Sequence, residues 1–265
     1  RVYGRGSCDI KGAVACLLEL AGSTAEPMAL LFTSDEEGAN GCCVAEFIRS
    51  AKCKVFSQVV VAEPTDCLAV MRHRGYLSVK GEFSGKAGHS SESRALQDNA
   101  LHKLAAWVTL AVDKAAEPDI QGHRSCFNVG EVHGGIKSNV IADQANLHWS
   151  ARLSPGDSNQ DFLESMTSLD RSNSAHWQVP FSGPPLPTRG MGISQAQAFI
   201  KKRDIEPGPA VDFWTEASLF AQAGIPAIVL GPGNINQAHR VDEWVSIEQL
   251  ELALNIYAQL AKTHD

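Results

Sequence analysis

Acidic residues and one histidine follow several apolar segments of this chain, at positions where they could bind a metal. Asp9 follows "RVY" and a glycine turn, Glu36 and Glu37 follow "ALLFTS", Glu63 ends "QVVVA", and His239 lies after "AIVLGPGN". In an open parallel sheet, ligands bind outside the carboxyl ends of the strands. Four separate connections are therefore expected to bring these side chains to one edge of a sheet.

Carboxylate oxygens and imidazole nitrogens are ligands that suit zinc and its neighbours. Two metal ions can share one bridging carboxylate. The adjacent residues Glu36 and Glu37 could then divide the work, with one binding metal and the other free to act as a base. A metal would also relieve the repulsion within "DEE". The alternative is a solvated turn that opens a helix, because acids favour a helix N-terminus.

Other chemistries fit the sequence less well. "GRGSCDIKG" lacks the third glycine of a dinucleotide-binding turn, and Asp9 in its place would repel a pyrophosphate. "GKAGHS" does not have the spacing of a phosphate-binding loop. No G-x-S-x-G motif for a serine nucleophile is present.

The composition limits the partners and the compartment. Hydrophobic residues make up 44% of the 265 residues, and the net charge is −7. A mildly acidic chain without a basic stripe argues against nucleic acid and against anionic membranes as partners. The seven cysteines include no C-x-x-C pair, which favours a reducing, cytoplasmic location. No apolar stretch reaches the ~18 residues of a membrane span.

The order of the expected elements predicts an α/β fold interrupted by an inserted α+β domain. Strands and helices alternate at both ends of the chain, and "MALLFTS" (28–34) is expected to be a buried parallel strand. The middle predicts a βαββαβ order, which is the ferredoxin-like split motif. The expected domains are residues 1–70 with 186–265, and residues 71–185.

Six ordered motifs give the chain its resemblance to a known family: "GRGSCDIKG", "FTSDEEG", "VVAEPT", "GKAGHSS", "GGIKSNVIA" and "GPGNINQAH". The chain resembles the dinuclear zinc amidohydrolases, which include aminoacylase and succinyl-diaminopimelate desuccinylase. It is most similar to the N-acetylornithine/N-acetylcitrulline deacetylase branch. The resemblance implies a mostly parallel-sheet, zinc-peptidase-like catalytic domain and a dimerisation or lid domain over residues 71–185.

The resemblance assigns roles to the metal-site residues. Asp9 would bridge two Zn²⁺ ions, with Co²⁺ or Mn²⁺ as possible substitutes. Glu37 and His239 would complete one metal site, and Glu63 would serve the other. Glu36 would be the general base that takes a proton from the attacking water.

Three further residues match the inserted domain of the family. His89 would help to hold the oxyanion, and in relatives it comes from the partner subunit of a homodimer. Asn139 and Arg152 would hold the backbone groups of the substrate, because a guanidinium grips a carboxylate bidentately. The implied function is removal of an N-acetyl group from a small N-acyl amino acid, as in arginine biosynthesis.

One part of the family pattern is missing. The family's first zinc ligand is a histidine upstream of the strand at "RVYGRG", and this chain begins with Arg1. The N-terminal part of the catalytic domain is therefore expected to be missing, either because the chain is a fragment or because its upstream residues are not counted. A form that is truly this short is expected to bind metal poorly and to turn over little substrate. Three readings stay open beside the deacetylase: a desuccinylase, a metallo-carboxypeptidase, and an inactive fragment or dimerisation module.

Overall fold

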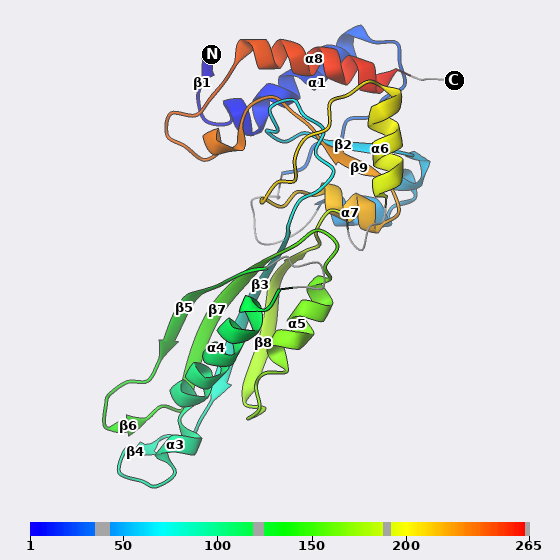
Figure 1. Cartoon of the computed structure of the whole chain (residues 1–265). Coiled ribbons are helices and arrows are strands. Elements are labelled where there is room, and N and C mark those ends of the chain that lie inside the picture. The colour runs from blue at the N-terminus through cyan, green and yellow to red at the C-terminus, as the bar shows by residue number, and fades with distance from the viewer. Residues whose placement is uncertain (35–42, 119–124, 188–191, 263–265) are drawn as a thin grey trace. The chain divides into compact units, whose positions relative to one another are not determined.

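The computed structural model describes residues 1–34, 43–118, 125–187 and 192–262. The chain divides into two compact units (Figure 1). Unit 1 comprises Arg1–His73 and Leu186–Asp265, and unit 2 comprises Arg74–Pro185.

Unit 2 is built on a four-stranded antiparallel sheet. Its strands are β3 (Gly75–Ser84), β5 (Cys126–Gly134), β7 (Gln144–Leu153) and β8 (Ala175–Gly183), in the spatial order β5-β7-β3-β8. Together with the helices α4 (Ala100–Ala116) and α5 (Asn159–Thr167), they follow one another in the βαββαβ order that the sequence predicts. A short helix, α3 (Ala95–Asp98), precedes α4.

Period-two alternation explains the core of unit 2. On β7 the odd-numbered residues from Ala145 to Leu153 are buried, and they face α4 and α5. Trp107 of α4 is 1% exposed, and its indole N–H donates to the carbonyl of Met166 at 2.9 Å. The ring of Trp107 also packs against the ring of Trp149, with centroids 6.1 Å apart. One face of the sheet is therefore sealed by the two helices.

A small two-stranded sheet lies beyond the end of the large sheet where β3 ends and β7 begins (Figure 1). Its strands are β4 (Gly88–His89) and β6 (Val140–Ile141), which pair antiparallel. His89 lies in β4, and Asn139 directly precedes β6.

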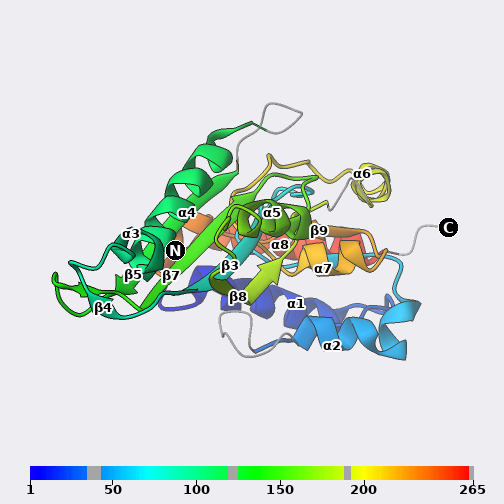
Figure 2. The ribbon, with the colours of Figure 1, turned by 90° about the horizontal axis from the view of Figure 1, so that it is seen from below.

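Unit 1 contains two separate strand pairs. β2 (Val59–Val61) and β9 (Ala227–Val229) are parallel, whereas β1 (Val2–Tyr3) and β10 (Trp244–Val245) are antiparallel. The five α-helices that the structure describes in this unit are α1 (Gly12–Ser23), α2 (Cys43–Arg49), α6 (Ile193–Lys202), α7 (Ala217–Gln222) and α8 (Ile247–Ala261). Helices α1 and α8 lie side by side (Figure 2), and Ser246 caps α8 by accepting from the N–H of Gln249.

The predicted strand over residues 28–34 is wrong. These residues have no regular secondary structure, and Leu31 and Phe32 are 47% and 55% exposed. A strand exists only where a neighbouring strand accepts and donates its hydrogen bonds, and no described residue pairs with this segment. The sequence also predicts a mostly parallel sheet in this unit, whereas the described residues form one parallel and one antiparallel pair.

In the part of the chain that the structure describes, no helix is both long and apolar enough to cross a membrane.

Asp170, between α5 and β8, gives unit 2 a pH-dependent contact. Its carboxylate accepts hydrogen bonds from the backbone N–H groups of Ser174 and Ala175, both at 2.8 Å, and from the hydroxyl of Ser172 at 2.6 Å. Burial disfavours the charged form, but these hydrogen bonds outweigh it and lower the pKa of Asp170. The ionised side chain therefore stabilises the folded unit.

We expect Asp170→Asn to lower the free energy of unfolding by about 1–2 kcal/mol at pH 7. Because the pKa is lower in the folded state, this stabilisation is present above the unfolded pKa of about 4. It is lost as the pH falls through the folded value. Urea unfolding at pH 7 and pH 2 measures both limits, with Asp113→Asn, on the exposed side of α4, as the control. An equal deficit at both pH values would contradict this account.

Candidate active site

The turn that carries Asp9 is held by a buried carboxylate far away in the sequence. Glu243 is 1% exposed and accepts hydrogen bonds from the backbone N–H groups of Gly6, Cys8 and Asp9 at 2.8, 2.9 and 2.9 Å. Gly6 has φ +82°, a left-handed conformation that glycine adopts without strain. The turn between β1 and α1 therefore takes its shape from Glu243.

The charges around this turn are mainly negative. Burial opposes the charged form of Glu243, but the three backbone hydrogen bonds and nearby Arg5 outweigh it and lower its pKa. Burial, together with Glu243 and Asp9, raises the pKa of the Cys8 thiol to about 11. Cys8 is therefore a neutral thiol at pH 7.

His239 meets the side chain of Asp9. The distance from His239 Nε2 to Asp9 Oδ2 is 3.4 Å, and the two side chains are 65% and 19% exposed. His239 has φ +61°, a left-handed conformation that costs a non-glycine residue on the order of 1–3 kcal/mol. Such strain concentrates at functional sites, where the surrounding structure must impose it. The structure thus brings two of the predicted ligands together at a solvent-accessible position.

Glu63 follows β2 and is half-buried. The loop that follows the neighbouring strand β9 lies against the backbone of Glu63. A Cβ added to Gly231 would lie 2.7 Å from the Glu63 carbonyl oxygen, and one added to Gly233 would collide with Cys8 Sγ. A single glycine loop therefore contacts both the Glu63 segment and the Asp9 turn, at the carboxyl ends of the parallel strands β2 and β9.

Glu36 and Glu37 lie outside the described residues. The segment that leads to them is tied to α7, because the hydroxyl of Thr33 donates to Glu216 Oε2 at 3.3 Å. Glu216 is 8% exposed and precedes α7. Neither Glu216 nor Glu243 is predicted from the sequence to have a role in the site. A carboxylate that hydrogen-bonds to the backbone leaves no spacing signal of its own.

The donor types at this edge suit a metal, and the contact between Asp9 and His239 is the geometric observation that supports one. Within the described ranges, no group of three or more His, Cys, Asp or Glu side chains is close enough to hold an ion. Glu37, the third predicted ligand beside Asp9 and His239, falls in the range 35–42 that the structure does not describe.

His89 and Asn139 lie together in unit 2. His89 pairs with Val140 across β4 and β6, and the N–H of Ser90 donates to the Asn139 carbonyl at 3.1 Å. Both residues are exposed. The hydroxyl of Ser91 is 2.8 Å from His89 Nδ1, which leaves Nε2 as the nitrogen that can face a ligand.

Salt bridges and backbone contacts brace the loop around His89. Glu92 accepts from the His89 N–H at 2.7 Å and pairs with Arg94 at 2.8 Å. Arg94 also donates to Asp98 at 2.8 Å and to the Lys86 carbonyl at 2.9 Å. This network holds the short segment in a defined shape.

Arg152 is at the opposite end of unit 2. It is half-buried, its guanidinium lies 4.0 Å over the ring of Tyr76, and burial lowers its pKa. Arg152 and Gln144 are eight residues apart on β7, which is about 27 Å at the usual rise of a strand. The structure therefore brings His89 and Asn139 together and separates both from Arg152.

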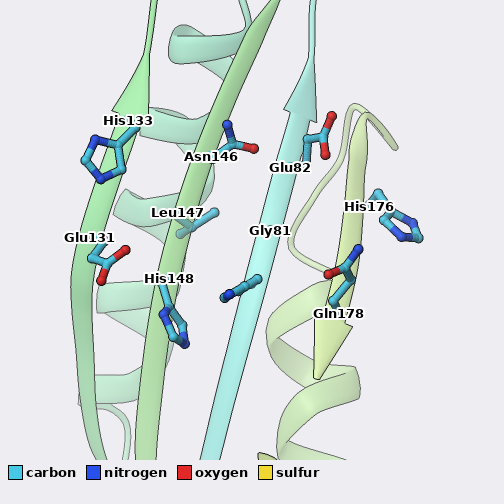
Figure 3. Close-up of a pocket in the computed structure, with 10 residues that line it drawn as sticks. Gly81, Glu82, Glu131, His133, Asn146, Leu147, His148, His176 and Gln178 are labelled. Carbon is cyan, nitrogen blue, oxygen red and sulfur yellow. The ribbon is translucent and has the colours of Figure 1, made fainter. Parts of the chain in front are cut away.

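The open face of the unit 2 sheet has a shallow depression of its own (Figure 3). Histidines and acids of four strands line it, including His133, His148, His176, Glu82 and Glu131. His148 Nε2 is 2.7 Å from the hydroxyl of Ser78. None of the predicted site residues lines this depression, and among the described residues its histidines and acids form no metal-binding group.

Comparison with known proteins identifies the family. The model of peptidase family M20/M25/M40 matches residues 1–263, and the chain belongs to this family. It is 39% identical over 262 residues to the N-acetyl-L-citrulline deacetylase of Xanthomonas campestris pv. campestris, covering 95% of this chain and 70% of that protein. It is 28% identical over 283 residues to the acetylornithine deacetylase of Edwardsiella ictaluri, covering 98% and 71%.

Solved structures agree on the fold. The aminopeptidase PepT of Bacillus cereus superposes with a TM-score of 0.66 at 15% identity, over 95% of this chain and 69% of that one. The YXEP protein of Bacillus subtilis, described as a dinuclear metal-binding peptidase from the M20 family, superposes with a TM-score of 0.65 at 15% identity, over 94% and 69%. The mixed α/β architecture is thus that of M20 peptidases.

We expect Gly231→Ala to destabilise unit 1, because the new methyl group must push the Glu63 backbone away. The cost of such overpacking is about 1–3 kcal/mol. Urea unfolding measures it. Gly22→Ala is the matched control, since a Cβ at Gly22 meets nothing within 4 Å and helix α1 gains from alanine. Equal stabilities of the Gly231→Ala variant and the wild type would show that this close approach is not required.

Proposed function

We propose that this protein hydrolyses the N-acetyl group from a small amino acid, with N-acetylcitrulline or N-acetylornithine as the substrate. The observation that carries the proposal is the contact between Asp9 and His239 at the ends of the strands, in a chain of a hydrolase family. The 39% identity to an N-acetyl-L-citrulline deacetylase supports the choice of substrate. We propose that the enzyme acts in arginine biosynthesis and is cytoplasmic.

The proposed cofactor is a pair of Zn²⁺ ions, for which Co²⁺ or Mn²⁺ could substitute. Asp9, Glu37 and His239 would hold one ion, and Asp9 with Glu63 would hold the other. The mixture of carboxylates and imidazole supports this assignment. The bound metals would polarise the substrate carbonyl and lower the pKa of the attacking water.

The protein's own groups would move the proton and hold the substrate. Glu36 takes a proton from the attacking water and passes it to the leaving amine. His89 donates a hydrogen bond to the developing oxyanion through Nε2. Arg152 grips the carboxylate of the amino acid bidentately, and its stacking on Tyr76 fixes the plane of the guanidinium. Asn139 holds the remaining backbone groups of the substrate.

The distance between His89 and Arg152 within unit 2 supports an active site that is formed by two subunits. Residues 71–185 are proposed as the dimerisation and lid domain of a homodimer. One substrate molecule is far smaller than the span of about 27 Å between the two ends of β7. His89 and Arg152 of one chain are thus too far apart to hold the same substrate, which supports the proposal that His89 acts in the site of the partner subunit.

We expect Glu36→Ala to lower kcat on N-acetylcitrulline by a factor on the order of 10² or more, because the proton loses its acceptor. Metal content, measured by elemental analysis, should stay as in the wild type. Glu46→Ala, on the exposed face of α2, removes the same charge and should keep full activity. An active Glu36→Ala variant would remove this residue from the mechanism.

Subunit exchange tests the proposed sharing of the site. His89→Ala and Glu36→Ala chains are each expected to be nearly inactive alone. Mixed dimers contain one complete site, so equal mixing should recover about a quarter of the wild-type activity. The measurement is the hydrolysis rate after exchange, with the unmixed variants as controls. No recovery, with exchange confirmed by mass spectrometry, would mean that His89 acts within its own chain.

A further inference from the structure

We infer that Glu243 is a positioning residue that holds the Asp9 turn in the shape needed to receive the metal ions. This inference rests on the proposed function. Neither oxygen of the carboxylate faces the solvent: Oε2 accepts from Gly6, and Oε1 accepts from both Cys8 and Asp9. Glu243 itself is not a metal ligand, because its two oxygens are engaged by these backbone N–H groups.

The segment from His239 to Glu243 contacts both the side chain and the backbone amide of Asp9. Four residues before Glu243, His239 meets the Asp9 carboxylate at 3.4 Å, while Glu243 accepts from the Asp9 amide at 2.9 Å. The side chain and the backbone of one proposed ligand are thus fixed by a single stretch of chain. Displacement of this stretch would move two proposed ligands, Asp9 and His239, at once.

Pairing of β1 with β10 fixes Glu243 in place below the turn. Tyr3 pairs with Trp244, and the N–H of Gly4 donates to the Glu243 carbonyl at 2.9 Å. The guanidinium of Arg1 lies 3.8 Å over the Trp244 ring. The backbone of Glu243 is therefore held by contacts that do not involve Asp9. This independent anchoring allows its side chain to position the Asp9 turn.

The Asp9 backbone needs such a support. Asp9 lies in the first turn of the helical segment Ser7–Lys11, where backbone N–H groups have no acceptor within the helix, and its φ of −119° and ψ of 88° depart from helical values. A buried acid is a costly way to satisfy amides if stability alone is at stake. Its use beside a proposed ligand is explained if it fixes that ligand, since the groups that orient metal ligands typically contribute 10–100-fold to metal affinity.

The test measures metal affinity separately from folding. Metal-free wild type, Glu243→Gln and the matched control Asp242→Asn, which removes the neighbouring exposed charge, are titrated with Zn²⁺ against a chromophoric chelator. We expect Glu243→Gln to bind Zn²⁺ about 10–100-fold more weakly, and Asp242→Asn to match the wild type. Excess Zn²⁺ should restore much of the activity of Glu243→Gln, whereas a purely structural defect would lower the thermal stability of the metal-free protein and would not respond to metal.

The outcomes separate this inference from the proposed function. If Glu243→Gln binds Zn²⁺ as tightly as the wild type, the inference is wrong and the proposed function stands. If the wild type binds none of Zn²⁺, Co²⁺ and Mn²⁺, both the proposed function and this inference are wrong.

A measurement on the wild type covers the case in which Glu243→Gln does not fold. The amides of Gly6, Cys8 and Asp9 should exchange their hydrogens slowly in the metal-free protein, because Glu243 already orders the turn. Exchange as fast as that of exposed loop amides would overturn the inference.

Discussion

The turn around Asp9 depends on one buried carboxylate. A side chain with 1% exposure accepts three backbone hydrogen bonds from a turn more than 230 residues away in the sequence. Such charge-assisted bonds are about twice as strong as neutral ones, and breaking them would leave buried donors unsatisfied. The same turn brings Asp9 to His239 and Cys8 to the glycine loop. The first and last segments of the chain are thereby joined at the place where the proposed chemistry occurs.

The length of strand β7 in unit 2 is a second constraint on the proposed site. A ten-residue strand separates the pair β4-β6 from Arg152, so this unit presents its proposed functional groups at two ends. A single small substrate cannot span this separation. This separation supports the proposed homodimer, in which the two ends of the sheet would act in different sites.

Much of the architecture was predictable because local periodicity and packing agreed. The alternation on β7 and the helix pattern around Trp107 specify a sheet with one sealed face, and unit 2 has the expected order of elements. The segment 28–34 shows the limit of this reasoning: its residues are apolar, but a strand also needs a partner, and periodicity does not reveal one. Helix α6 (Ile193–Lys202) was not predicted from the sequence.

The candidate site was predictable to the extent that residue type and strand ends reveal it. Asp9 and His239 were named from the sequence, and they are in contact. Glu36 and Glu37 lie outside the described residues. The residues that shape the site were missed: an acid that accepts backbone hydrogen bonds, such as Glu243, has no characteristic spacing, and the left-handed backbone of His239 is invisible in a sequence.

The most direct test of the central claim is the hydrolysis of N-acetyl-L-citrulline and N-acetyl-L-ornithine before and after metal removal. The released amino acid is measured in the protein as prepared, after dialysis against a chelator, and after addition of two equivalents of Zn²⁺. A metal-dependent deacetylase should turn over one of the two substrates, lose the activity with the chelator and regain it with Zn²⁺. Activity that survives complete metal removal, or no turnover of either substrate by a protein that holds two metal ions, would contradict the account.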